Sequence, residues 1–524
     1  MRFWPTRDFS PALAPVLFAV LLALQGCDGR APASEETNAA VVYTLRFPEP
    51  ETQMAEIEVE VPTSGLQEAE LMMPVWSPGF YRVQDYASKV QELTARTSDG
   101  QELAVTHPRP NHWQVETGGE SEILVSYRLY CPDSFVTTNW VSPDLLVLNG
   151  GATYITPAGQ GKHRFEVWIE PAPTWSGVAT GLPELPDASP YNYWADDYDT
   201  LVDAPIVAGD LEVTTFLVDG VEHHLVDVGE KEGWDSHRAS EDLQDIVEET
   251  LPLWGELPYE KYVFLNVFRR GGGGLEHENS TLLTTSARAM ATPDGYRGWL
   301  SFASHEYFHA FNVKRLRPIE LGPFDYEAPP RTSSLWLSEG VTSYLGDLFV
   351  ARAGLMSREE YLASLSSVIR RLQESPGRLL QSLEQSSLEV WTNSNSGVGA
   401  APTTVSYYVK GQVVGFLLDA RIRTATNGER TFEDFMRLAY QRYGGERGFT
   451  PEELQATAEE VAGVGLGEWF GTALASTREL DYTEALEWFG LGFAEDWGLE
   501  VLELPSQAQQ EHLAALLAPA YPDG

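Results

Sequence analysis

The residues most able to do chemistry in this sequence are His305, Glu306 and His309, which form a His-Glu-x-x-His pattern. They lie in the segment GWLSFASHEYFHAFNV (298–313), which is apolar on nearly every face and therefore predicts a buried helix. Residues four apart share one face of a helix, so both imidazoles can reach one metal ion at about 2.0–2.1 Å. Glu306 is one step round the helix, where it can face a water molecule held by that ion.

An energetic argument favours a metal at this pattern. Two imidazoles and a carboxylate on a buried apolar helix are unfavourable by several kcal/mol unless a partner satisfies them. A divalent cation satisfies all three, and zinc is the ion expected for this pattern. Lys314 and Arg315 follow where a helix C-terminus favours cations, and Pro318 is expected to stop the helix.

A third ligand is expected from the second helical segment, TSSLWLSEGVTSYLGDLFV (332–350). One stripe of this segment is apolar and the other is small and polar, and Glu339 is the only acid in its first half. We predict Glu339 as the third ligand, the alternative being a solvated surface glutamate. Two histidines and one glutamate leave a fourth position open, which is typical of a catalytic zinc. Such an ion lowers the pKa of its water toward about 7, and Glu306 can then act as general base and pass the proton to a leaving amine.

Four separate motifs in this order resemble the M61 glycyl aminopeptidase family of gluzincin metallopeptidases. SHEYFHAFNVKRLRP (304–318) and LWLSEGVTSYLGDLF (335–349) are close to the two zinc helices of that family. MPVWSPGFYRVQDY (73–86) looks like its N-terminal signature, and SYYVKGQVVGFLLDARIR (406–423) looks like the helix after its active site. The resemblance runs from about residue 41 to about residue 490. It implies a zinc-dependent aminopeptidase that removes small N-terminal residues, glycine or alanine, from peptides.

The resemblance also implies roles for two further residues. Relatives carry a Gly-x-x-Glu segment on a sheet edge beside the zinc, which here is Gly273–Glu276, so Glu276 is expected to bind the free α-amine of the peptide. Glu278 is the alternative, because the sequence does not fix the strand register. Tyr408, in Tyr-Val-Lys-Gly, matches the tyrosine that stabilises the oxyanion in those relatives; plain aromatic packing is the alternative.

Two other functions fit part of the pattern. A thermolysin-type zinc endopeptidase needs the same metal ligands but no amine-binding glutamate. A peptide-binding envelope protein without catalysis could keep a vestigial zinc site, although a pure binder has no need of Glu306.

The elements that position these residues predict a multidomain α+β protein. Short β-branched and aromatic runs separated by turn clusters predict an N-terminal β-sandwich over 41–205. A thermolysin-like zincin α+β catalytic domain follows at 206–355, with a helix over 240–257 that Ser240 is expected to cap. A helical subdomain at 356–490 completes the active site, and 491–524 is a tail with a short helix. Many family members continue into a PDZ domain after about residue 490, and the remaining stretch is too short for one.

The N-terminus is typical of a bacterial lipoprotein signal. An apolar run (11–24) leads to Leu24-Gln25-Gly26-Cys27, and a polar tether is expected over 28–40. We therefore expect a lipid on Cys27 and attachment to the bacterial cell envelope, on its periplasmic or other extracytoplasmic face. Of 524 residues, 77 are Asp or Glu and 35 are Lys or Arg, giving a net charge of −42 that disfavours nucleic acid as a partner. Cys131 is left as a lone thiol, expected in the core.

Overall fold

The computed structural model describes residues 39–159, 163–186, 190–392 and 402–520, and residues 39–524 group into one compact unit. The predicted signal with Cys27 and the tether as far as residue 38 lie outside the described residues, as does most of the polar loop at 392–404. Among the described residues, no helix combines the length and hydrophobicity that crossing a bilayer requires.

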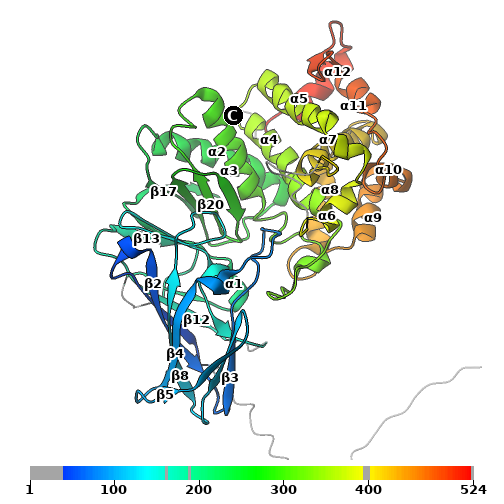
Figure 1. Cartoon of the computed structure of the whole chain (residues 1–524). Helices are drawn as coiled ribbons and strands as arrows, with labels where there is room; N and C mark the ends of the chain where they lie inside the picture. The colour runs from blue at the N-terminus through cyan, green and yellow to red at the C-terminus, as the bar shows by residue number, and fades with distance from the viewer. Residues whose placement is uncertain (1–38, 160–162, 187–189, 393–401, 521–524) are drawn as a thin grey trace, which may run out of the picture. The chain divides into compact units, whose positions relative to one another are not determined.

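The N-terminal third is a sandwich of antiparallel and mixed sheets (Figure 1). The larger sheet runs β14 (Asn192–Ala195), β12 (Phe165–Glu170), β1 (Val41–Arg46), β2 (Met54–Pro62), β8 (Glu122–Tyr130), β4 (Val90–Thr97) and β5 (Glu102–Leu103). The facing sheet runs β11 (Thr156–Pro157), β3 (Glu68–Met72), β7 (His112–Glu116) and β6 (Val105–Arg109). A third sheet runs β13 (Gly177–Thr180), β15 (Ile206–Gly209), β10 (Leu145–Leu148) and β9 (Trp140–Val141).

Alternation along β2 explains why these strands pack as a sandwich. Ile57, Val59 and Val61 are buried, whereas the glutamates between them face outward. The strands predicted from short β-branched runs are present at β1, β2, β7, β8, β10 and β12. Cys131 lies in this core, and burial raises the pKa of its thiol to about 12, so it is the inert core cysteine that the sequence predicted.

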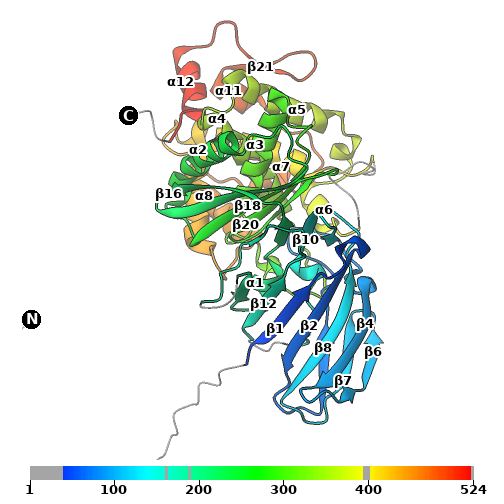
Figure 2. The same ribbon diagram turned by 90° about the vertical axis from the view of Figure 1, so that its left-hand side faces the viewer.

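The sheet that carries the site follows in the order β16 (Glu212–Val218), β17 (Val221–Gly229), β18 (Lys261–Phe268), β20 (Ser280–Thr285) and β19 (Gly273–Glu276). β17, β18 and β20 are parallel, and the edge strand β19 is antiparallel to β20. Helices α2 (Ser236–Trp254) and α3 (Pro293–Phe308) cover one face, as Figure 2 shows. The other face packs on β10 and β15 of the third sheet, so β18 is buried on both sides.

Helices form the rest of the molecule. They are α1 (Tyr198–Val202), the π-helical η5 (Trp336–Val341), α4 (Thr342–Arg352), α5 (Arg358–Glu374), α6 (Leu383–Leu388), α7 (Tyr407–Ala425), α8 (Phe432–Tyr443), α9 (Pro451–Ala462), α10 (Gly467–Ala473), α11 (Thr483–Phe489) and α12 (Gln507–Leu516). Short 3₁₀ turns are η1 (Pro50–Thr52), η2 (Tyr86–Lys89), η3 (Gly150–Ala152), η4 (Ile319–Leu321) and η6 (Pro376–Leu379). A hairpin of β21 (Leu491–Phe493) and β22 (Leu499–Val501) precedes α12. The chain is thus mixed α+β, with a sheet-rich N-terminal part and a helical C-terminal part; the boundaries at 205, 355 and 490 stay predictions.

Two details differ from the sequence prediction. Helix α2 begins at Ser236 rather than near Ser240, because the Asp235 carboxylate accepts the Arg238 N–H and caps the helix earlier. The C-terminal hairpin was not predicted, because its two strands are too short to show a period.

Candidate metal centre and active site

Helix α3 carries His305 in its last turn, and His309 directly follows its last residue. Pro293 occupies its first turn and the Thr292 hydroxyl accepts the Gly295 N–H, so its start is well capped. Its regular part ends at Phe308, earlier than predicted, and 309–316 continue as hydrogen-bonded turns. This turn lets the His309 Nδ1–H donate to the Asn312 carbonyl at 2.7 Å, which leaves Nε2 free to bind a metal.

The predicted second helix is present and holds Glu339 in its π-helical part, η5. Glycines let its neighbours come close: a Cβ on Gly340 would lie 2.5 Å from the Cα of Gly411 in α7. The Ser343 hydroxyl donates to the Glu339 carbonyl at 3.0 Å and lies 3.2 Å from Nδ1 of His305. This orients the second imidazole as well, with its Nε2 toward Glu339.

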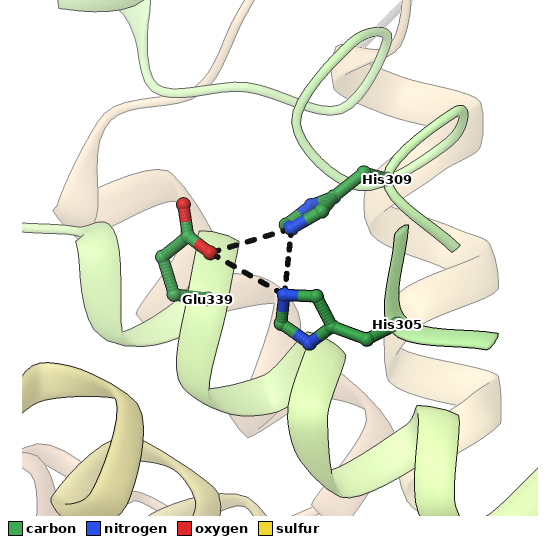
Figure 3. Close-up of side chains that lie close together, drawn as sticks. All are labelled: His305, His309 and Glu339. Carbon is green, nitrogen blue, oxygen red and sulfur yellow. Dashed lines mark hydrogen bonds and ion pairs between the residues drawn. The ribbon is translucent and has the colours of Figure 1, made fainter. Parts of the chain in front are cut away.

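The three predicted ligands converge on one point (Figure 3). The two Nε2 atoms are 3.0 Å apart, and Oε2 of Glu339 lies 3.3 Å from that of His309 and 3.6 Å from that of His305. Ligands at about 2.0–2.1 Å in a tetrahedron are separated by about 3.3 Å, so this set fits a zinc-sized ion. Oε1 of Glu339 is buried without a described hydrogen-bond partner, which also fits a carboxylate that binds a cation.

A second group overlaps the first. Glu276, Glu306 and His309 have ligand atoms within 4.8 Å of one another. On the edge strand β19, Gly274 and Glu276 face α3 while Leu275 packs into the core behind the sheet. A Cβ on Gly274 would overlap the Glu306 carboxylate, so the bare backbone of this glycine leaves room for that carboxylate. The register therefore brings Glu276 to the site, and Glu278, the alternative, is exposed.

The buried carboxylates around His309 favour a bound positive charge. Burial raises the pKa of Glu306 well above its usual range; His309 opposes that shift, and the Glu276 and Glu339 carboxylates add to it. Burial alone would lower the pKa of His309, yet Glu276 and Glu339 raise it to about 10. Three carboxylates around two imidazoles are thus stabilised only by a proton or a cation.

Tyr408 lies in the first turn of α7, which the Ser406 hydroxyl caps by accepting the Val409 N–H. Its ring is half-buried, stacks on Tyr407 at 4.8 Å and lies 6.1 Å from the His305 ring. Gly411, one turn later, packs against the backbone of η5 and so brings this helix close to Glu339. The structure therefore places Tyr408 beside the metal ligands, whereas its role in catalysis stays a prediction.

Residues of the N-terminal signature also reach the site, although their spacing in the sequence did not predict this. Burial and then the Glu339 and Glu276 carboxylates raise the pKa of Tyr81 well above its usual range. Gly79 packs on the Glu276 carboxylate. Gly79, Tyr81 and Glu276 all line one cavity of 870 Å³. The motif at 73–86 was the sequence signal for these residues. Sequence periodicity cannot show that the motif contacts residues about two hundred positions further along the chain.

Two family models match separate parts of this chain. The family model described as the Peptidase M61 N-terminal domain matches residues 42–210, and that described as M61 glycyl aminopeptidase matches residues 298–414. No curated protein matches this sequence.

Solved structures share the fold. An aminopeptidase N family protein from Idiomarina loihiensis is 29% identical with a TM-score of 0.80, covering 86% of this chain and 78% of that one. A mutant of an M1 zinc metallopeptidase from Deinococcus radiodurans is 14% identical with a TM-score of 0.52, over 85% of this chain and 95% of that one. Leukotriene A4 hydrolase from Saccharomyces cerevisiae is 13% identical with a TM-score of 0.50, over 84% of this chain and 68% of that one. The last two show the fold alone. The two family models together match more than half of the chain, which therefore belongs to the M61 peptidase family and is a metallopeptidase.

Proposed function

We propose that this metallopeptidase is a zinc aminopeptidase that removes glycine or alanine from the N-termini of peptides. The observation that carries the proposal is the overlap of two groups at His309: a metal set with His305 and Glu339, and a carboxylate pair of Glu276 and Glu306. A buried carboxylate next to the metal set, with an unpartnered oxygen, suits a substrate ammonium group. The preference for small residues rests on the family resemblance.

In this proposal each residue of the site has its own role in substrate binding or catalysis. Glu276 holds the α-amine, which places the first peptide bond at the metal set. Zinc, bound by His305, His309 and Glu339, would activate water and polarise the scissile carbonyl. Glu306 takes a proton from the attacking water and delivers it to the leaving amine, and its buried carboxylate lies beside Gly274 of the edge strand. Tyr408 donates to the developing oxyanion.

The test uses a panel of aminoacyl arylamides with and without a zinc chelator, together with one peptide in free and N-acetylated form. We expect fastest cleavage of glycyl and alanyl substrates, loss of cleavage with chelator and recovery with zinc. Acetylation should abolish cleavage, because it removes the charge that Glu276 binds. Equal rates on the free and acetylated peptide would instead indicate an endopeptidase, and no hydrolysis across the panel by zinc-loaded protein would indicate a binder.

The proposal includes a place in the cell, a lipid anchor on Cys27 at the extracytoplasmic face of the envelope. It rests on the signal-like segment and on the acidic composition. In cell fractionation the intact protein should pellet with membranes and Cys27→Ser should not; equal distribution of the two would refute the anchor.

A further inference from the structure

The N-terminal β region (residues 41–205) contacts the end of β19, the strand that carries Glu276. Asp203, which closes the short helix α1, is nearly buried, with 13% of its side chain exposed. Its Oδ1 accepts from Nδ1 of His277 at 3.1 Å, and its Oδ2 accepts the backbone N–H of Glu278 at 2.8 Å. One carboxylate thus binds both residues that directly follow Glu276.

The same carboxylate also binds the segment after the metal helix. Nζ of Lys314 donates to Oδ1 of Asp203 at 2.6 Å, and only 7% of the Lys314 side chain is exposed. Burial would raise the pKa of Asp203, but Lys314 and His277 lower it to about 2, so the carboxylate stays charged. Asp203 therefore links the strand of Glu276 to the chain that continues from His309.

A second contact comes from the N-terminal signature. Gly79 has a φ of +85°, and a Cβ built on it would lie 2.7–2.8 Å from both oxygens and the carboxyl carbon of Glu276. The Glu276 carboxylate therefore rests on bare backbone, and any side chain at 79 has to displace it. Gly79 and Asp203 both line the 870 Å³ cavity that Glu276 also lines.

We propose that Asp203 and Gly79 are positioning residues that fix Glu276 relative to Glu306 and His309, so that the N-terminal β region makes this enzyme selective for a free α-amine. The inference rests on the proposed function. Neither residue is a catalytic residue: Asp203 acts through the strand end, and Gly79 acts by leaving space for the carboxylate.

The experiment compares alanyl-p-nitroanilide with propionyl-p-nitroanilide, which lacks only the amine. The readout is the ratio of kcat/KM for the two substrates in the zinc-loaded protein. Asp203→Asn should lower this ratio by about ten- to a hundredfold, since a misplaced Glu276 loses a charge-assisted interaction. The loss should lie mainly in KM for the alanyl substrate. Asp199→Asn is the matched control: it is also on α1 and bonds the Tyr326 hydroxyl at 2.6 Å, but no described hydrogen bond joins it to 276–278.

A second pair of variants covers the case in which Asp203→Asn does not fold. Gly79→Ala should lower the ratio, whereas Gly100→Ala should not, although Gly100 also has a positive φ, +92°, because nothing lies within 4 Å of its Cβ position. If Gly79→Ala keeps the ratio, or if either test variant slows both substrates equally, the positioning role is refuted. A wild-type enzyme that does not prefer the free amine would refute the proposed function instead, so the two failures are distinguishable.

Discussion

At the scale of single residues, each imidazole of the metal set is oriented by a neighbour that binds its far nitrogen. The Asn312 carbonyl accepts from His309, and Ser343 bridges His305 to the backbone of Glu339. The Asn312 amide also donates to the Leu337 carbonyl and the Thr342 hydroxyl, both at 2.9 Å, and so connects the two metal-binding segments. Such partners fix the tautomer that a metal requires.

Glu306 is the residue whose replacement separates chemistry from binding. Glu306→Gln keeps the shape and removes the base, so we expect kcat to fall by at least about a hundredfold, which is the usual contribution of a general base. Zinc content, measured by elemental analysis, should stay at one ion per chain, because Glu306 is not a predicted ligand. Turnover at the wild-type rate would contradict its role as base.

At the scale of elements, the site depends on close helix crossings. Gly340 of η5 meets Gly411 of α7, and a Cβ on Gly346 of α4 would lie 3.2 Å from the backbone nitrogen of His305 in α3. The Ser304 hydroxyl donates to the Gly346 carbonyl at 3.0 Å across the same crossing. Small residues at these points let three helices bring His305, Glu339 and Tyr408 together.

Gly340→Ala tests these crossings. The added Cβ would lie 2.5 Å from the Cα of Gly411, so backbone has to move, at about 1–3 kcal/mol of stability. We expect a lower Tm and weaker zinc binding, since Glu339 is the preceding residue. Gly298→Ala in α3 is the control: nothing lies within 4 Å of its Cβ position, so Tm should stay the same or rise. Equal effects of the two substitutions would show that the crossing tolerates a methyl group.

At the scale of the whole molecule, the C-terminal segment is held on the helices of the metallopeptidase part. The Ala520 N–H lies 2.9 and 3.0 Å from the two oxygens of Glu249 in α2. Nε of Arg352 in α4 donates to the Leu516 carbonyl at 2.9 Å, and its guanidinium pairs with Glu433 at 2.6 Å. The segment up to Ala520 is therefore part of the folded unit.

This contact predicts a pH dependence of stability. Burial raises the pKa of Glu249 to about 7, although the Ala520 N–H and Arg352 lower it. The folded protein then holds this proton more tightly than the unfolded chain, so Glu249 makes stability fall as pH rises from about 4.5 to about 7. Glu249→Gln cannot ionise, so its Tm should drop less than that of the wild type between about pH 5 and pH 8. Parallel Tm curves for the two proteins would contradict this assignment.

Much of the local structure was predictable because it has a local cause. The alternation in β2 reflects a strand with one buried face, and the all-round apolar character of 298–308 reflects a buried helix. The His-Glu-x-x-His spacing places two imidazoles on one side of that helix. These are properties of a few consecutive residues, and the structure contains all of them.

What could not be predicted depends on contacts between distant segments. The choice between Glu276 and Glu278 required the observed end of β19, because this strand pairs with β20 only as far as Glu276, and Glu278 lies beyond it. Tyr81 and Gly79 reach the site only because the N-terminal signature packs against β19 and η5.

Short-range spacing and residue chemistry were therefore enough to predict the family, the α+β class and the identities of the candidate metal ligands. The packing of distant segments was needed to show which carboxylates lie at His309 and how the N-terminal β region reaches Glu276, through Asp203 and Gly79. The physical reason is that burial and proximity raise or lower the free energy of a charge far more than its sequence neighbours do, and both exist only once distant segments have packed together.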